Sequence, residues 1–380
     1  MEYLNRNTTS SEEFTLNSPL YSNTTVTGII DDKLLYDQQD TDLLSRTGVQ
    51  ISAWLVPLVF GLITICGVVG NLLVIYVICR HGSMKTVTNY YIINLAATDI
   101  AFLVCCAPFT ASLYAVPEWI FGRFLCKFVF YMMQVTAQAT CMTLTTMSVD
   151  RYQAIVHPLR SLKTRTTKLA LIVSIVIWTS SFLMSIPLAV YFDLERSSFD
   201  GEITYQTYCA EIWPVSVRHI LWPGYAIYAA VLMYLMPLLI ISICYSIMLL
   251  KVWTRVAPGD IGRAANNDRN VQQVQQKRKV TRMVLAVVVV FALCWFPIHT
   301  LNLWMRLSKD FPYSYSTYIF KVFAHTLSYA NSCVNPFVYA FMGENFRKYL
   351  KKAFPICFRT AREFAEHHER TEARTLNTNT

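Results

Sequence analysis

The chain has 380 residues, of which 54% are hydrophobic and only 15% are charged. Soluble domains usually carry about 25% charged residues, so this composition excludes an ordinary soluble domain and favours a membrane protein. The net charge of +9 would suit nucleic acid, but the basic residues lie in short segments between apolar runs. No stripe of basic and aromatic residues, of the kind that binds single strands, is present in the sequence. We therefore expect a membrane protein without a nucleic-acid partner.

Residues 1–53 form a polar leader in which acidic residues outnumber basic ones. This leader lacks a positively charged start followed by an apolar core, so we expect no cleavable signal peptide and insertion directed by the first span. Asn7-Thr8-Thr9 and Asn23-Thr24-Thr25 are glycosylation sequons. We expect a flexible extracellular tail that is glycosylated at Asn7 and Asn23.

Seven apolar stretches follow, each long enough to cross a membrane core. That core is about 30 Å thick and takes roughly 20 helical residues to cross. In lipid the backbone must satisfy its own hydrogen bonds, so we expect helices, and the alternation typical of barrel strands is absent. The predicted fold is an all-α membrane protein in which residues 54–342 form a seven-transmembrane helix bundle. The predicted spans are 54–79, 90–115, 124–151, 168–191, 222–250, 280–305 and 316–341.

The loops between these stretches set the orientation, because cytoplasmic loops carry an excess of lysine and arginine. Two of the loops hold several basic residues and no acid, and a third ends in Lys277-Arg278-Lys279. We place these loops in the cytoplasm, which puts the amino terminus outside and the carboxyl terminus inside. The expected location is the plasma membrane.

Asp150-Arg151-Tyr152 ends the third stretch. A charge at mid-bilayer costs roughly 2.5–3.5 kcal/mol on insertion scales. At the cytoplasmic rim, Arg151 can instead reach water or a partner, and Asp150 can neutralise it locally. An ordinary charged stop after a span is the alternative, and the companion motifs below favour a surface that binds a second protein.

Most of the 11 cysteines lie inside the predicted spans, where they serve as small apolar packing residues. Cys126 and Cys209 lie on the outer side and are natural partners in an oxidising compartment. A bridge between them would hold the loop after the fourth span across the mouth of the bundle. Its typical stabilisation is about 2–4 kcal/mol.

Residues 343–356 predict an amphipathic helix on the membrane surface. Phe346, Leu350 and Phe354 fall on one face, and basic residues on its flank attract anionic lipid. Cys357 follows this helix and is a candidate for palmitoylation, with an unmodified cysteine as the alternative. Residues 357–380 then form a cytoplasmic tail.

Several short motifs occur in a fixed order along the predicted spans. In chain order they are Gly70-Asn71, Asn94-Leu95-Ala96-Ala97-Thr98-Asp99, Trp119 with Phe121 and Gly122, Asp150-Arg151-Tyr152, Trp178, Pro237, Tyr245, Cys294-Trp295-Phe296-Pro297 and Asn335-Pro336-Phe337-Val338-Tyr339. Each motif alone is weak, but their joint order resembles the rhodopsin-like G-protein-coupled receptors from about Trp54 to Cys357. Within that family, stretches such as FLVCCAPFTASLY and FAHTLSYANSCVNPFVYAF resemble kisspeptin receptors, with galanin receptors as the nearest rivals.

The resemblance implies a hinge that responds to a ligand in the outer cavity. A ligand pressing near Trp295 would bias the sixth span outward, and the opened cleft would take the carboxyl-terminal helix of a G protein. The implied switch residues are Pro237, Tyr245, Phe291, Trp295, Pro297, Asn335, Pro336 and Tyr339. The implied coupling residues are Asp150, Arg151 and Tyr152. The resemblance also suggests the Gq/11 class and phospholipase C, with arrestin as a further partner.

One departure from the family pattern lies at the base of the sixth span. Some members carry an acid there that locks the arginine of the third span, whereas this sequence has Lys277, Arg278 and Lys279. We therefore expect no interhelical lock, and a closed state that depends on Asp150 and packing.

Asp99 is the one acid deep in the predicted bundle. A buried carboxylate needs a partner or a raised pKa. The resemblance implies a sodium ion held by Asp99 with Thr140, Asn331, Ser332 and Asn335, and no other cofactor. The alternative is a protonated Asp99 that is hydrogen-bonded with waters.

The expected ligand is a peptide. Amine receptors of the family carry an Asp where Met133 stands, and opsins carry a Lys where Tyr329 stands, so an amine or retinal is disfavoured. Kisspeptin-like peptides end in an amidated Arg-Phe, for which Glu211 is the candidate partner of the arginine and Glu118 a weaker one. The implied contacts of the amide and the ring are Gln134, Trp295, His299, Asn302 and His325. Helix packing is the alternative role of each polar residue among them.

Two other classes of protein are disfavoured. A transporter would show internal repeats and broken helices that meet at mid-membrane, and no convincing repeat relates the two halves. An enzyme is not expected, since the sequence contains no GxSxG, HExxH or phosphate-binding loop. Two alternatives within the receptor family stay open: a galanin receptor, and a receptor for a different peptide ending in Arg-Phe-amide.

Overall fold

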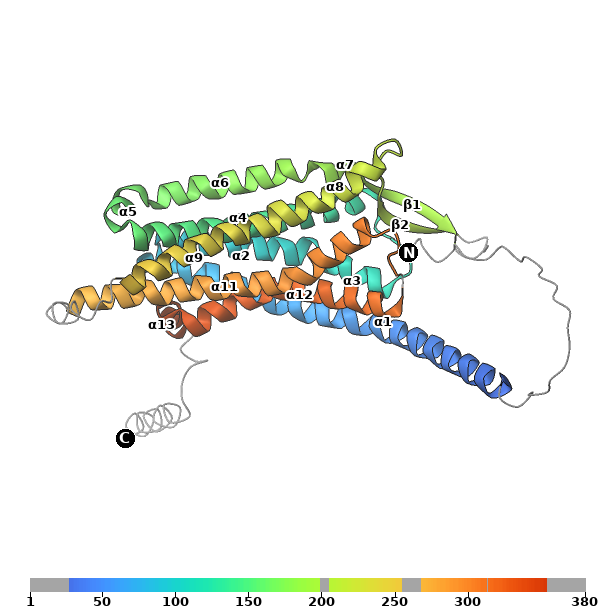
Figure 1. Ribbon diagram of the computed structural model, residues 1–380. Coiled ribbons are helices and arrows are strands. Elements are labelled where there is room, and N and C mark those ends of the chain that lie inside the picture. Colours follow the sequence, from blue (N-terminus) through green and yellow to red (C-terminus); the bar gives the residue numbers. More distant parts are fainter. Residues whose placement is uncertain (1–26, 199–204, 255–267, 313, 354–380) are drawn as a thin grey trace, which may run out of the picture.

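The computed structural model describes residues 27–198, 205–254, 268–312 and 314–353. Long helices run side by side to form an elongated bundle, and a two-stranded hairpin lies at one end of it (Figure 1). The predicted modification sites Asn7, Asn23 and Cys357 lie outside the described residues, as do Phe354 and the tail that follows.

The helices have the following bounds: α1 (Thr27–Arg80), α2 (Val87–Cys105), α3 (Ala107–Ala115), α4 (Gly122–Val156), α5 (Pro158–Thr164), α6 (Thr167–Met184), α7 (Ile186–Tyr191), α8 (Arg218–Ala230), α9 (Met236–Thr254), α11 (Asp268–Leu307), α12 (Tyr315–Met342) and α13 (Glu344–Ala353). A 3-10 turn, η1 (Gly82–Met84), joins α1 to α2, and a π-helical turn, η2 (Val231–Leu235), joins α8 to α9. The strands are β1 (Phe192–Ser198) and β2 (Tyr205–Glu211).

Five described helical segments are long and apolar enough to cross a membrane. They are Thr47–Arg80, Val87–Ala115, Thr167–Tyr191, Arg218–Lys251 and Arg278–Leu307. Each contains one of the predicted spans, which confirms a helical membrane protein.

The predicted spans 124–151 and 316–341 fall on α4 and α12, which are not among the five apolar segments. Both helices carry polar side chains that are buried inside the bundle instead of facing its surroundings. The buried polar side chains of these helices include Thr136, Gln138, Thr140, Thr143, Ser148, Ser328, Asn331, Ser332 and Asn335. A helix surrounded by other helices can keep such groups, because its neighbours supply hydrogen-bond partners.

The first helix begins at Thr27, well before the predicted start at Trp54. Figure 1 shows α1 extending past the rest of the bundle on the side of the hairpin. The segment 29–47 contains no Gly or Pro, so nothing in it interrupts a helix. The predicted span 54–79 therefore lies within a longer helix, whose apolar segment is Thr47–Arg80.

The three prolines among the implied switch residues lie in two different settings. Pro297 and Pro336 lie inside α11 and α12, which continue through them. Pro237 is the second residue of α9, and only Met236 separates it from η2, where the helix changes its hydrogen-bond register. A proline has no backbone N–H to donate. Pro237 therefore lies beside a turn in which the α-helical hydrogen-bond pattern is already changed.

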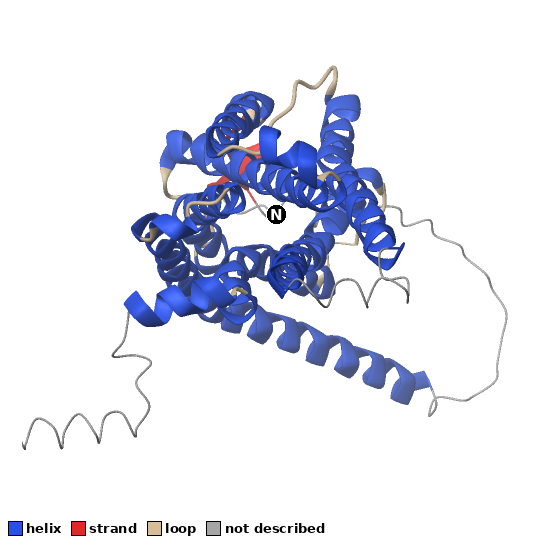
Figure 2. Cartoon of the chain, turned by 90° about the vertical axis from the view of Figure 1, so that its left-hand side faces the viewer, coloured by secondary structure: helices blue, strands red, loops and turns tan. Residues whose placement is uncertain are grey.

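The centre of the bundle is formed by α2, α4 and α12. Helix α12 packs against α1, α2 and α11, and α4 packs against α2, α6 and α9. Figure 2 looks at the bundle from the end that carries α5, where the long helices are seen nearly end-on. One contact is very close: a Cβ placed on Gly70 of α1 would lie 3.0 Å from both Cβ and Cγ of Pro336.

We expect Gly70→Val to destabilise the bundle by about 1–3 kcal/mol, because its side chain overpacks the contact with Pro336. Gly61→Val is the matched control, since Gly61 lies on the same helix with no atom within 4 Å of an added Cβ. The measurement is the thermal unfolding midpoint of the purified protein in detergent. An equal decrease for the two variants would contradict a special role of this contact.

The hairpin covers the end of the bundle where α4 begins. Strands β1 and β2 are antiparallel, with Leu194 opposite Cys209. Cys209 is bonded to Cys126 in the first turns of α4, with a Cα–Cα distance of 5.6 Å. This confirms the predicted disulfide and fixes β2 over the bundle mouth.

Helix α13 lies within the predicted amphipathic segment 343–356. Phe346 is buried, and Tyr349 and Leu350 are half-buried against the core. Arg347, Lys348, Lys351 and Lys352 are exposed. Tyr349 joins the helix to the first loop, where its hydroxyl lies 2.5 Å from Ser83 Oγ and its ring 4.5 Å from that of His81.

Candidate functional site

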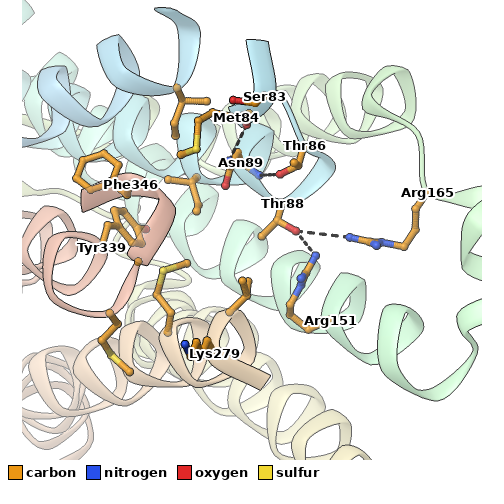
Figure 3. A pocket seen from close by; sticks show the side chains of 16 residues that line it. Ser83, Met84, Thr86, Thr88, Asn89, Arg151, Arg165, Lys279, Tyr339 and Phe346 are labelled. Carbon is orange, nitrogen blue, oxygen red and sulfur yellow. Dashed lines mark hydrogen bonds between the residues drawn. The ribbon is translucent and has the colours of Figure 1, made fainter. Parts of the chain in front are cut away.

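A cavity of about 400 Å³ opens at the end of the bundle opposite the hairpin. It is formed by η1 and by α2, α4, α11, α12 and α13 (Figure 3). The residues that line it are Ile78, Ser83, Met84, Thr86, Thr88, Asn89, Ile92, Arg151, Arg165, Lys279, Val280, Met283, Tyr339, Met342, Gly343 and Phe346. These side chains include three cations and no carboxylate, so the cavity is electropositive.

Arg151 is buried at the wall of this cavity. Its Nη2 lies 2.5 Å from Asp150 Oδ2, and it also donates a hydrogen bond to Thr88 Oγ1. Both members of the ion pair are buried. The local neutralisation of Arg151 by Asp150, predicted from their adjacency, is confirmed.

Arg165 is a second partner of the same carboxylate, and sequence reasoning missed it. Its Nε lies 2.6 Å from Asp150 Oδ1 and its Nη2 lies 2.8 Å from Asp150 Oδ2. Figure 3 shows Arg151 and Arg165 converging on Thr88 from separate segments. One aspartate therefore holds two arginines, which joins α4 to the segment that precedes α6.

The base of α11 contributes Lys279 to the cavity. Among the ion pairs within the described residues, Arg151 is joined to Asp150 and to no acid of α11.

The three predicted tyrosines lie around the same end of the bundle. Tyr152 is half-buried, and its ring lies 5.8 Å from that of His157. Tyr245 donates a hydrogen bond of 3.3 Å to the carbonyl of Thr281, which joins α9 to α11. Tyr339 lines the cavity, and its buried hydroxyl has no hydrogen-bond partner in the described part of the chain.

Asp99 lies in the centre of the bundle and is fully buried. Its Oδ2 accepts a hydrogen bond of 2.8 Å from Asn335 Nδ2, and Ser332 also interacts with it. The oxygens Asp99 Oδ1, Asn331 Oδ1 and Asn335 Oδ1 are buried without hydrogen-bond partners among the described residues. Thr140 is buried on α4, outside these hydrogen bonds.

Carboxylate and amide oxygens of this kind suit a hard cation. No group of three or more His, Cys, Asp or Glu side chains that could hold a metal occurs in the part of the chain that the structure describes. The oxygens around Asp99 are those of one carboxylate and two side-chain amides, a donor set that suits a hard cation better than a soft transition metal.

The predicted switch residues on α11 form a ladder of rings. Phe291 and Trp295 have ring centroids 6.0 Å apart, and Trp295 and His299 lie 6.1 Å apart. Trp295 also lies 6.0 Å from Phe102 of α2. The rings therefore follow one another along α11, and Trp295 joins them to α2.

Three of the four polar side chains predicted to contact the peptide amide have partners within the protein. Gln134 Nε2 lies 2.7 Å from Met233 Sδ, and the ring of His299 lies 5.0 Å from that of Tyr234. His325 Nδ1 lies 2.8 Å from the hydroxyl of Tyr114. The roles of Tyr114 and Tyr234 were missed, because a tyrosine in a predicted span carries no positional signal. Asn302 is half-buried on α11.

Glu211, the last residue of β2, is already paired. Its Oε2 lies 2.6 Å from Arg306 Nη2, near the end of α11. Both side chains are mostly buried, with exposed fractions of 8% for Glu211 and 15% for Arg306. Glu118, the weaker candidate, accepts a long hydrogen bond of 3.5 Å from the backbone N–H of Thr207. The sequence offered no sign of Arg306, which resembles any other basic residue beside a span.

Comparison with known proteins identifies the family. Residues 70–339 match the model of the 7 transmembrane receptor (rhodopsin family). The chain is 47% identical over 308 residues to G-protein coupled receptor 54 of Oreochromis niloticus, which covers 81% of this chain and 80% of the relative. It is 44% identical to the KiSS-1 receptor of Mus musculus, over 86% of this chain and 82% of the relative.

The galanin receptor type 1 of Homo sapiens is 38% identical, over 81% of this chain and 83% of the relative. The order of these identities agrees with the resemblance seen in the motifs. These relatives are receptors and not enzymes, which confirms that the chain is not an enzyme. Together with the five apolar segments, the match makes the chain a multi-pass membrane protein. The chain belongs to the rhodopsin family of seven-transmembrane receptors.

Proposed function

We propose that this chain is a plasma-membrane receptor for an amidated peptide of the kisspeptin type, ending in Arg-Phe-amide. The observation that supports it most is the higher identity to receptors named for KiSS-1 than to a receptor named for galanin. The outer end of the bundle adds a mostly buried acid, Glu211, and the amide and imidazole groups of Gln134, Asn302 and His299. Such groups suit a cationic side chain and a terminal amide.

The proposed topology has seven spans, with α4 and α12 as the two that carry polar faces. Support comes from the length of these two helices and from their packing against the helices that contain the five apolar segments. The loops rich in basic residues and the electropositive cavity then face the cytoplasm, and the hairpin faces outside. In this topology the leader is glycosylated outside, and Cys357 lies where it can be palmitoylated.

The proposed signalling is a shift between two packings of the bundle. A peptide contact near Trp295 favours the packing in which α11 moves outward at its cytoplasmic end, and the ligand must bind that packing better. The widened cavity then accepts the carboxyl-terminal helix of a G protein of the Gq/11 class, with arrestin as a later partner. Arg151, Tyr245 and Tyr339 surround that cleft.

We also propose that a sodium ion binds beside Asp99 and favours the inactive packing. The oxygens without partners on Asp99, Asn331 and Asn335 support this. We expect sodium chloride, compared with choline chloride, to lower agonist affinity about fivefold or more, the usual range of an allosteric coupling. Asp99→Asn should remove this difference, as measured by competition binding. Equal affinities in both salts for the unsubstituted receptor would leave the protonated carboxyl as the explanation.

The test of the proposed function is a calcium-release assay in cells that express the receptor. Peptides ending in Arg-Phe-amide should raise calcium, whereas galanin should not. A response to galanin alone would replace the kisspeptin class by the galanin class. A Gq/11-selective inhibitor should abolish the response, and persistence of the signal would point to another G protein. Ligand uptake into vesicles without nucleotide exchange would instead indicate a transporter.

A further inference from the structure

The ion pair between Glu211 and Arg306 has aromatic side chains near it, at the end of the bundle that carries the hairpin. The guanidinium of Arg306 lies 5.8 Å from the centre of the Trp222 ring. Trp213 stacks on Tyr191 with ring centroids 4.1 Å apart, and lies 5.9 Å from Tyr225. A carboxylate held among such rings is poorly hydrated, so it needs a cationic partner at all times.

Glu211 is held firmly in place by the backbone around it. Two residues before it, Cys209 is bonded to Cys126 of α4. Directly after it, the N–H of Ile212 donates a hydrogen bond of 2.7 Å to the carbonyl of Tyr191. The carboxylate is therefore a fixed feature, whereas its partner comes from a flexible arginine side chain on α11.

The pair leaves hydrogen-bonding groups unused in this pocket. Glu211 Oε1 and the Tyr225 hydroxyl are buried without hydrogen-bond partners among the described residues. Tyr225 interacts electrostatically with both Glu211 and Arg306, so the two oxygens lie in one neighbourhood. Arg306 Nε also has no acceptor among the described residues. A second guanidinium would find two acceptors here that Arg306 does not use.

We propose that Arg306 determines specificity by competing with the arginine of the peptide for Glu211. The incoming guanidinium takes the carboxylate and the Tyr225 hydroxyl, and Arg306 keeps the face of Trp222 as its remaining partner. A ligand without a cation cannot displace Arg306, because the exchange would leave the buried carboxylate unpaired. This inference rests on the proposed peptide ligand and adds a named selectivity residue to it.

The test uses two amidated peptides that differ at one residue. One ends in Arg-Phe-amide, and the other carries citrulline, a neutral side chain of nearly the same shape, in place of the arginine. Competition binding of both peptides is measured on membranes with the unsubstituted receptor, Arg306→Gln, Glu211→Gln and the double variant. Surface expression is measured for each.

We expect Arg306→Gln to tighten binding of the arginine peptide about tenfold and to leave the citrulline peptide nearly unchanged. Glu211→Gln should remove most of the preference for arginine. In the double variant, the loss of Arg306 should have no further effect, because the contested carboxylate is gone. Arg306→Lys, which keeps the charge, should lie between the unsubstituted receptor and Arg306→Gln.

Arg218→Gln is the matched control. The guanidinium of Arg218 lies over the same Trp222 ring at the same 5.8 Å, but Arg218 is exposed. Its loss should not change the preference between the peptides. Equal effects of Arg306→Gln on both peptides, or a weaker preference for arginine, would overturn the competition. Failure of both peptides to bind the unsubstituted receptor would refute the ligand class itself, and this inference with it.

Discussion

Arg151→Gln should reduce agonist-stimulated nucleotide exchange at least tenfold, a loss of about 1.4 kcal/mol or more in coupling, while peptide affinity stays nearly unchanged. Arg151 is the buried cation at the wall of the inner cavity, near the carboxyl end of α4, whereas the hairpin is bonded to the beginning of that helix. Glutamine keeps the length and polarity of the side chain but removes the charge that a G-protein helix would meet. The measurement is exchange on a purified heterotrimer, with peptide binding on the same membranes.

The variant should still fold, because the Asp150 carboxylate keeps a cationic partner after Arg151 is replaced. Asp150 keeps two short contacts with Arg165, at 2.6 and 2.8 Å. Removing one partner of a buried ion pair usually costs several kcal/mol because the other charge stays unpaired. Here the second arginine limits that cost, and it also limits the cost of releasing Arg151 toward a G protein.

Arg160→Gln is the control for a general loss of positive charge, since Arg160 is exposed on α5, the short helix that follows α4. It should leave exchange within about twofold, as surface substitutions away from buried features usually do. Full signalling by Arg151→Gln would refute its role in coupling. A joint loss of binding and exchange would show that Arg151 supports the fold instead.

The pairs that could be predicted from the sequence share a simple property. Asp150 and Arg151 are neighbours in the chain, and Cys126 and Cys209 are the cysteines that the orientation places outside. In the first case adjacency in the chain restricts the choice of partner, and in the second case the predicted orientation does. The ring ladder around Trp295 was also predictable, because its members recur along one helix at helical spacing.

The charged partners Arg165 and Arg306 could not be predicted, for a physical reason. A basic residue near the end of a span has the same appearance whether it is solvated, paired with lipid or paired with an acid. Arg306 meets Glu211 only because the disulfide brings β2 over the end of α11, and that arrangement is three-dimensional. Naming Glu211 as the partner of the peptide arginine did not reveal that Glu211 already pairs with Arg306.

Apolarity alone also proved an incomplete guide to the bundle. All seven spans were predicted from apolar stretches, but α4 and α12 lie in the centre and carry many buried polar side chains, so they are less apolar than the other five. Asn331, Ser332 and Asn335 are polar, which lowers the hydropathy of α12 and also makes them suitable neighbours of the buried Asp99 carboxylate. The helices with the weakest membrane signal thus hold Arg151, Tyr339 and the oxygens around Asp99.

Cys209→Ser should lower peptide affinity at least about a hundredfold and destabilise the receptor by several kcal/mol. The bond closes a loop with a sequence separation of 83. The chain-entropy model gives about 4–5 kcal/mol for a loop of that length. Affinity should fall because Glu211, two residues further on, loses the anchor that holds it over the bundle mouth.

Cys126→Ser and the double variant are included, because loss of either cysteine breaks the same disulfide. All three should have the same affinity and unfolding midpoint, since a second removal breaks nothing further. Cys79→Ser, at an exposed free cysteine on α1, is the control and should leave both quantities unchanged. Additive losses from the two single substitutions would mean that each cysteine acts separately. The hairpin would then need another anchor, such as the 2.7 Å hydrogen bond from the Trp119 N–H to the Thr207 carbonyl, to hold it over the bundle.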